Sequence, residues 1–250
     1  MYTQDEVSPR FWSNFYSRRQ KQDLPDYIKM CIKSNIIINS NDFEIIILNN
    51  EYIIKLFQYL LPFNWNCNNI NNELKVDILK YTLLYNFGGI WIKPSTIVFK
   101  NFKYLEKLLK DNDVLSINDI NNENLIIAGN KNSKILFFIL NNLKKNLLYP
   151  KNEYLFNNYK INNLIKTSKI KYKNYLLNTE SGNFDTNNQF ITYKNILSKN
   201  KTFFKNKNEV IFFQIDNEII NKYNHYNWFK RLNESQLLKS NLWFSHLIKI

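Results

Sequence analysis

Cysteine and glycine are scarce in this sequence. The two cysteines, Cys31 and Cys67, form no Cys-X-X-Cys pair and have no spacing typical of a zinc site, which argues against a disulfide framework or a structural metal centre. Reduced thiols in an intracellular protein are the simplest interpretation. Only four glycines occur in 250 residues, and two of them, Gly88 and Gly89, are adjacent. Such a pair in so glycine-poor a chain indicates a geometric requirement.

Long apolar runs are also lacking. No secretory signal opens the sequence, and its apolar clusters, such as residues 36–38 and 44–48, have the length of strands, not of membrane spans. The sequence therefore predicts a cytoplasmic protein without a transmembrane segment. We expect any contact with a membrane to be peripheral, through the basic surface or a partner.

Positive charge is plentiful but scattered. Lysine and arginine number 34 against 21 acids, a net charge of +13, yet the densest groups, at 18–21 and 166–173, are short. No RNA-binding or zinc-finger signature accompanies them, so we interpret the lysines as solvated surface and expect no nucleic-acid partner. The many Asn, Lys, Ile, Tyr and Phe residues are those encoded by A+T-rich codons. We therefore attribute this composition to genomic bias and draw no functional conclusion from it.

The glycine pair lies within residues 75–100, which read KVDILKYTLLYNFGGIWIKPSTIVFK. Ahead of it, apolar residues recur every three or four positions and predict an amphipathic helix that ends near Asn86. The repeat consists of Leu74, Ile78, Tyr81 and Tyr85. Gly88 and Gly89 are expected to end this helix, because glycine accepts the left-handed backbone that other residues resist.

Two strands are predicted to follow the glycines. β-Branched and aromatic residues gather at 90–92 and again at 96–99. Lys93, Pro94 and Ser95 form a polar break between them. The unit is therefore a helix, a glycine turn, a buried strand, a polar break and a second strand.

This unit resembles the core of the capsular polysaccharide synthesis family of glycosyltransferases, which is related to the sugar transferases with a DXD motif. The family pattern is K-S-D-I-L-R-x-x-L-L-Y-x-Y-G-G-I-W-I-D-x-[TD], and most of residues 77–92 match it. A second family pattern, P-x-Y-x-x-x-C-I-x-S, matches from Pro25. The resemblance covers residues 25–143 and is weak over 150–250. It implies one GT-A-like domain over 1–250, with a mostly parallel sheet flanked by helices and a helical C-terminal part.

The chain departs from the family at the acidic motif, where Lys93 and Ser95 stand in place of both acids. In the family, carboxylates there hold a divalent Mn or Mg ion that neutralises the diphosphate of a nucleotide-sugar donor. Their loss argues against a metal cofactor, and we assign no metal ligand. Two interpretations of Lys93 stay open: its ammonium group replaces the ion as a catalytic residue, or it is a solvated side chain on a site that has lost catalysis. Ser95 remains a donor-binding candidate.

The resemblance implies roles for residues ahead of the strand as well. Asp77 and Lys80 lie three positions apart and share a face of the predicted helix. In the family this face meets the donor sugar, so Asp77 is a candidate catalytic residue and Lys80 a donor-binding one. An ordinary surface ion pair is the alternative. Gly88 and Gly89 are donor-binding candidates because they would let backbone approach the donor.

Further candidates lie toward the two ends of the chain. Related enzymes often stack an aromatic residue on the nucleotide base, and the family often carries a C-terminal His or Trp near the diphosphate. Trp12 or Phe15, and His225, are therefore donor-binding candidates. Core aromatic residues and a structural hydrogen-bond donor are the respective alternatives. The acids of the glycine-containing loop 179–188 form another candidate metal site or base.

The remaining pattern alternates strands and helices, which predicts a doubly wound sheet. Expected helices are at 27–34, 52–60, 102–109, 135–143, 152–163 and 232–250. Expected strands are at 43–48, 113–117, 125–129 and 210–215, with 43–48 as a parallel strand.

Two functions fit these expectations. The first is transfer of a hexose from a nucleotide-diphosphate sugar to a glycan or protein acceptor, in which the leaving phosphate takes the acceptor's proton. The second is a catalytically inactive relative that binds glycan or serves as a scaffold, which the replacement of both acids favours.

Overall fold

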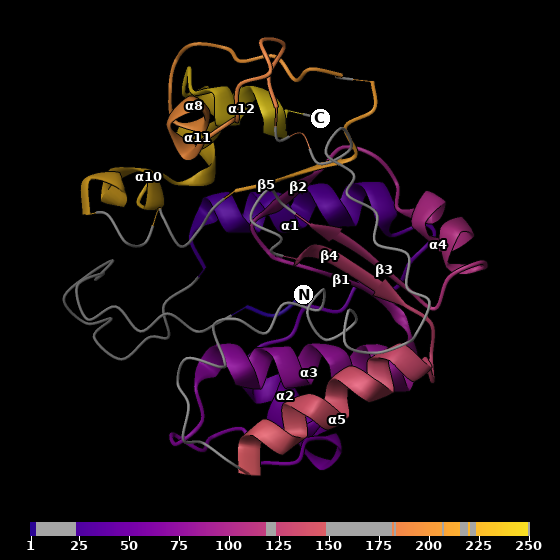
Figure 1. The fold of residues 1–250 in the computed structure, drawn as a ribbon. Coiled ribbons are helices and arrows are strands. Elements are labelled where there is room, and N and C mark those ends of the chain that lie inside the picture. Colours follow the sequence, from indigo (N-terminus) through magenta and orange to yellow (C-terminus); the bar gives the residue numbers. More distant parts are fainter. Residues whose placement is uncertain are drawn as a thin grey trace, which may run out of the picture. The chain divides into compact units, whose positions relative to one another are not determined.

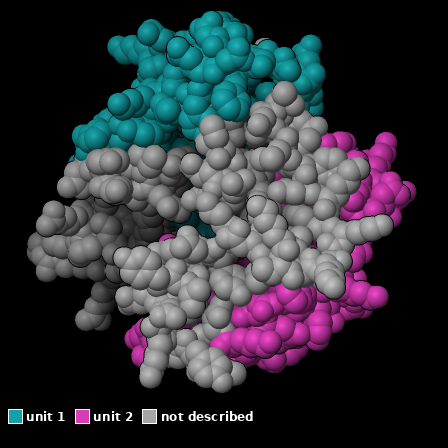
Figure 2. Space-filling view, viewed as in Figure 1, with its two compact units in different colours: residues 1–50, 93–101, 179–250 teal, residues 51–92, 102–178 magenta. Residues whose placement is uncertain are grey.

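The chain divides into two compact units (Figure 2). The computed structural model describes residues 1–3, 24–118, 124–148, 182, 184–206, 208–215, 220 and 224–249. Unit 1 comprises residues 1–50, 93–101 and 179–250, and unit 2 comprises residues 51–92 and 102–178. Neither unit is continuous in sequence, because the chain passes from one to the other several times.

Unit 2 is built on two long helices, α3 (Asn72–Phe87) and α5 (Lys134–Leu148), which pack against each other (Figure 1). The side chain of Asn71 caps the start of α3 by accepting a hydrogen bond from Glu73 N at 2.8 Å. Gly88 ends the helix, with its N–H donating to Leu84 O. This is the helix and glycine stop that the sequence predicts.

Unit 2 also contains a three-stranded sheet with the strand order β1-β4-β3. Its strands are β1 (Gly89–Ile92), β4 (Asn124–Gly129) and β3 (Val114–Asn118). Both pairings are antiparallel, with Gly89 opposite Gly129 and Val114 opposite the same glycine. The buried positions of these strands are apolar except for Ser116 on β3, and α4 (Lys103–Leu109) precedes β3 and packs on it.

Unit 1 is organised around α1 (Asp26–Asn39), which packs against β2 (Thr96–Val98). β2 pairs in antiparallel fashion with β5 (Phe212–Gln214). Two short helices, α11 (Glu234–Lys239) and α12 (Trp243–Ile248), also contact α1. Helix α8 (Tyr193–Ile196), the 3₁₀ turn η2 (Asn224–Tyr226) and α10 (Asn227–Lys230) complete the described elements of this unit.

Aromatic rings form the centre of unit 1. Tyr27 lies 4.9 Å from Phe229 and 6.5 Å from Phe244, measured between ring centroids, and the two phenylalanines are 5.4 Å apart. All three side chains are fully buried. The two contacts of Phe244 are edge-to-face, which adds to the stabilisation from apolar burial, so residues far apart in sequence hold the unit together.

The prediction of a mostly parallel, GT-A-like sheet is wrong. The described strands form a three-stranded and a two-stranded sheet, and every pairing within them is antiparallel. The segment 43–48, predicted as a parallel strand, is not part of a sheet and makes one isolated parallel bridge, between Tyr2 and Leu48. Apolar runs predict that a segment is extended and buried, but the direction of its partner depends on tertiary contacts.

Other boundaries differ in smaller ways. The helix expected at 27–34 continues to Asn39, so residues 36–38 are helical. The helix expected at 52–60 is split into α2 (Asn50–Leu56) and a 3₁₀ turn, η1 (Gln58–Leu60). The predicted helix over 232–250 is broken between α11 and α12. The helix expected at 152–163 lies outside the described residues.

Membrane-spanning helices are not found in the part of the chain that the structure describes, where each helix is too short or too polar.

Candidate functional site

Asp77 and Lys80 form an ion pair on α3. Lys80 Nζ lies 2.5 Å from Asp77 Oδ1, and the same ammonium group is 4.9 Å from the centroid of the Tyr81 ring. The Lys80 side chain is 12% exposed, whereas that of Asp77 is 39% exposed. The ammonium group is therefore held against the protein, while the carboxylate is open to solvent. The described structure thus brings these two candidate side chains into polar contact.

Gly88 and Gly89 both have positive φ, of 74° and 106°. A Cβ atom on Gly88 would lie 3.0 Å from Lys131 N and 3.3 Å from Gly129 O, so this glycine lets the end of α3 pack against the backbone after β4. A Cβ atom on Gly89 would meet nothing within 4 Å. Only Gly89 thus has open space beside it for an approaching ligand.

Lys93 follows β1 directly and lies in the turn before β2. Its carbonyl oxygen accepts a hydrogen bond from Thr96 N at 3.2 Å, which closes the turn, and its side chain is half-buried. An ammonium group at this position can face an anion but cannot ligate a cation. Its assignment to a donor diphosphate stays a prediction.

Ser95 has a structural role, because its side chain and backbone both form hydrogen bonds with Ile215. Its hydroxyl group donates to Ile215 O at 3.0 Å, and Ile215 N donates to Ser95 O at 2.9 Å. Only 4% of the residue is exposed. The side chain expected to bind the donor is therefore engaged in joining the start of β2 to the end of β5.

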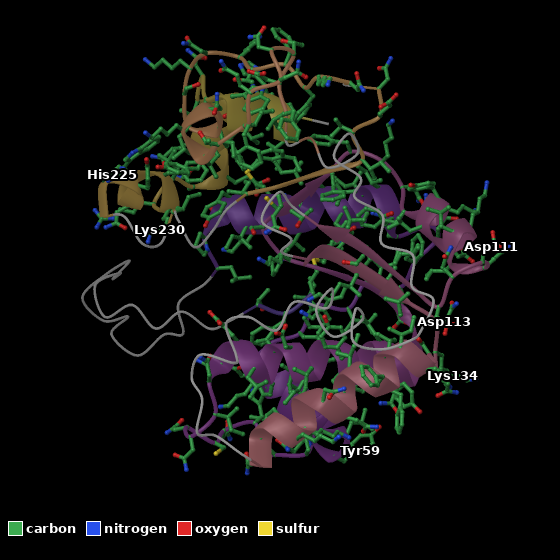
Figure 3. All side chains as sticks on the ribbon, viewed as in Figure 1. Tyr59, Asp111, Asp113, Lys134, His225 and Lys230 are labelled. Carbon is green, nitrogen blue, oxygen red and sulfur yellow. The ribbon has the colours of Figure 1, made fainter. Side chains whose placement is uncertain are left out.

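His225 lies in η2 and is exposed, with its ring centroid 3.8 Å from that of Tyr226. His225 and Lys230, both labelled in Figure 3, belong to unit 1. This contact agrees with the alternative of a structural histidine in an aromatic cluster. Trp12 and Phe15, the candidates for base stacking, lie outside the described residues.

Asp185, from the acidic loop 179–188, has a local structural role. One of its carboxylate oxygens accepts hydrogen bonds from Asn187 N and Gln189 N, each at 2.8 Å. The residue is 9% exposed and forms an antiparallel bridge with Phe204. Backbone donors that satisfy a carboxylate in this way fix a turn. Glu180, the other acid of the loop, lies outside the described residues.

The candidate residues are divided between the two units. Asp77, Lys80 and the glycine pair belong to unit 2, and Lys93, Ser95 and His225 belong to unit 1. Among the described residues, no group of three His, Cys, Asp or Glu side chains could hold a metal ion. The sequence contains one Asp-X-Asp, at Asp111 and Asp113, and both acids are exposed in the turn before β3 (Figure 3).

A buried lysine on α3 was not anticipated from the sequence. Lys75 is 6% exposed, and its ammonium group donates to Trp65 O at 3.0 Å and to Cys67 O. It thereby fastens the asparagine-rich loop before α3 to the helix. Its burial could have been predicted from its position four residues before Leu79, because residues four apart share one side of a helix.

Two further unanticipated polar atoms lie on β2 and β5. Thr96 and Gln214 are opposite each other in the strand register. Thr96 Oγ1 and Gln214 Oε1 are buried without a hydrogen-bond partner. Such atoms cost free energy in a folded protein, because they have lost their hydrogen bonds to water.

Comparisons of the chain with protein-family models, with curated proteins and with solved structures found no match.

Proposed function

We propose that the chain is a glycosyltransferase-like binding protein, which holds a nucleotide-diphosphate sugar or a glycan at Asp77 without transferring the sugar. The observation that carries this proposal is the asymmetry of the ion pair on α3. Lys80 is almost buried and fixes the carboxylate of Asp77, which is 39% exposed and able to accept ligand hydroxyl groups.

A carboxylate held in this way suits a sugar. Its two oxygens can accept hydrogen bonds from neighbouring hydroxyl groups, and hydrogen bonds to an ionised group are stronger than neutral ones. The ammonium group of Lys80 limits the rotation of the carboxylate, so less side-chain entropy is lost on binding. Open space beside Gly89 on the following strand lets a ligand reach the backbone there.

The residues at the acidic motif support binding without transfer. Lysine at 93 cannot ligate a cation, and the hydroxyl group of Ser95 is engaged by Ile215 O. These two positions therefore offer no carboxylate for a Mn or Mg ion at the donor diphosphate. A donor would be held by its sugar and lack the metal-assisted departure of the diphosphate.

The test is a thermal-shift screen of UDP- and GDP-sugars and of free glycans, each with and without manganese. We expect a stabilising ligand to raise the melting temperature of the wild type by a few degrees and to have no effect on Asp77→Asn. The matched control is Glu106→Gln, which neutralises an exposed acid on α4 of the same unit and should respond like the wild type. No shift with any ligand, or an equal shift in Asp77→Asn, would overturn the proposal.

Hexose transfer is the second candidate, and the position of Lys93 favours it. This lysine follows Ile92, the last residue of β1, where the resembling family has its first acid. If its ammonium group replaces the metal ion, donor hydrolysis should proceed without manganese and stop in Lys93→Ala. Release of free sugar by the wild type would refute the hypothesis that the protein is catalytically inactive. It would not contradict ligand binding at Asp77.

A further inference from the structure

A lysine- and phenylalanine-bearing surface lies on unit 1 and includes none of the candidates for sugar binding. Its centre is the segment 201–205, in which Phe204 forms an antiparallel bridge with Asp185. Along this segment Lys201, Phe203 and Lys205 are exposed, whereas Phe204 between them is 8% exposed and packs on Trp243. Successive side chains of paired, strand-like backbone point to opposite sides, so Phe203 and Lys205, which flank buried Phe204, share one face. Lys201 is exposed two residues before Phe203.

A neighbouring turn fixes this segment. Thr186 N donates to Phe203 O at 3.0 Å, and Lys205 N donates to Phe184 O at 2.9 Å. The turn also carries Phe190, which is 42% exposed and packs against Phe184 with ring centroids 5.9 Å apart. Phe203 is 64% exposed. Exposed rings on a hydrogen-bonded framework are presented at little entropic cost.

Helix α12 adjoins this segment. Trp243 N donates to Ser198 O at 2.9 Å, which joins the start of α12 to the chain leading into the segment. Lys249, the residue after α12, is exposed. Among the described residues, no carboxylate forms an ion pair with Lys201, Lys205 or Lys249.

We propose that the face formed by Phe190, Lys201, Phe203 and Lys205, called here the Lys-Phe face, docks on an anionic lipid surface. The aromatic rings enter the boundary between headgroups and acyl chains, and the ammonium groups remain at the level of the lipid phosphates. This function goes beyond sugar binding and does not depend on it.

The side-chain types favour lipid over nucleic acid. Proteins that bind single strands present aromatic rings on which successive bases stack, together with arginine forks that meet phosphates. The Lys-Phe face contains no arginine, and its most exposed ring stands between two lysines. Lysine ammonium groups are point charges that suit a fluid layer of headgroups, where no fixed phosphate geometry has to be matched.

Vesicle co-sedimentation of the full chain tests this proposal. The vesicles consist of phosphatidylcholine alone or of phosphatidylcholine mixed with phosphatidylserine. We expect binding to the anionic vesicles at low salt, with about a fivefold loss of affinity or more for each of Lys201→Glu and Lys205→Glu. Phe203→Ser should weaken binding and leave its salt dependence unchanged, because it removes apolar insertion and no charge.

A matched control lies on α5 of unit 2. Lys134→Glu with Phe137→Ser makes the same chemical changes at an exposed lysine, labelled in Figure 3, and at a phenylalanine that is 50% exposed. This variant should bind vesicles like the wild type, and circular dichroism confirms that each variant is folded. Absence of binding to anionic vesicles, or an equal loss in the control, would overturn the proposal. The proposal would also be overturned if the chain bound single-stranded RNA but no vesicles, and if Lys201→Glu and Lys205→Glu abolished the RNA binding.

Discussion

Ser95 and Ile215, which are 120 residues apart in sequence, hold each other by a reciprocal pair of hydrogen bonds, from Ser95 Oγ to Ile215 O and from Ile215 N to Ser95 O. Ser95→Ala removes the first of these and leaves a buried carbonyl group with one partner fewer. We expect a loss of about 1 kcal/mol in the free energy of unfolding, measured by urea denaturation. An unchanged denaturation midpoint would show that the hydroxyl group does not stabilise unit 1.

Ser95→Asp, which restores an acid of the family motif, should be far more damaging. It places a carboxylate at a position that is 4% exposed, beside a carbonyl oxygen that cannot donate to it. Breaking buried polar contacts and leaving a charge unpaired costs on the order of 3–5 kcal/mol. We therefore expect Ser95→Asp to melt well below Ser95→Ala and to gain no manganese-dependent activity. Wild-type stability for this variant would mean that the side chain can turn outward.

Thr96, the next residue, should respond in the opposite direction. Its hydroxyl group is buried without a partner, whereas the hydroxyl group of Ser95 is bonded. Thr96→Val has the same shape and removes the unsatisfied polar atom. We expect it to stabilise the protein by about 1 kcal/mol, seen as a higher urea midpoint. Destabilisation would indicate that Thr96 finds a hydrogen-bond partner in solution.

Gly88→Ala should destabilise unit 2 more than Gly89→Ala. Both substitutions force alanine into a left-handed backbone, which costs about 1–2 kcal/mol. Only at Gly88 would the new Cβ atom also press on backbone, 3.0 Å from Lys131 N. Thermal melts of the two variants measure the difference. Equal melting temperatures would mean that the backbone after β4 shifts without cost.

The two cysteines should differ in reactivity. Cys31 is fully buried in α1, and burial raises the pKa of its thiol, so the reactive thiolate is not formed at neutral pH. Cys67 is partly exposed in the loop that Lys75 fastens. Iodoacetamide labelling followed by mass spectrometry should modify Cys67 in the native protein and Cys31 only in denaturant. Lys75→Met should speed the labelling of Cys67, whereas rapid native labelling of Cys31 would contradict this account.

Much of the local structure around the glycine pair could be predicted from sequence. Helix α3 and strands β1 and β2 lie within a residue or two of their expected bounds. These elements are encoded by short-range signals, namely apolar spacing, β-branched and aromatic runs, and a glycine stop. The strong periodicity of 135–143 likewise predicted α5.

Sheet direction and the engagement of Ser95 could not be predicted from sequence. β1 pairs with β4 only after α4 and β3 have intervened, and nothing in residues 89–92 specifies an antiparallel partner. The role of Ser95 depends on Ile215 in the same way. The prediction of one long C-terminal helix is wrong for another reason. The apolar residues follow a helical period, but the chain turns at Ser240. There the hydroxyl groups of Ser240 and Ser245 donate hydrogen bonds to the carbonyl oxygen of Leu237.

The pairing of β2 with β5 has a consequence for synthesis on the ribosome. β2 leaves the exit tunnel long before its partner strand has been translated, because the residues that join the two, Ser95 and Ile215, are 120 positions apart. At about 5–20 residues per second, this interval lasts roughly ten seconds. During that time the apolar edge of β2 has no strand to pair with, so a nascent chain stalled before β5 should be a client for a chaperone.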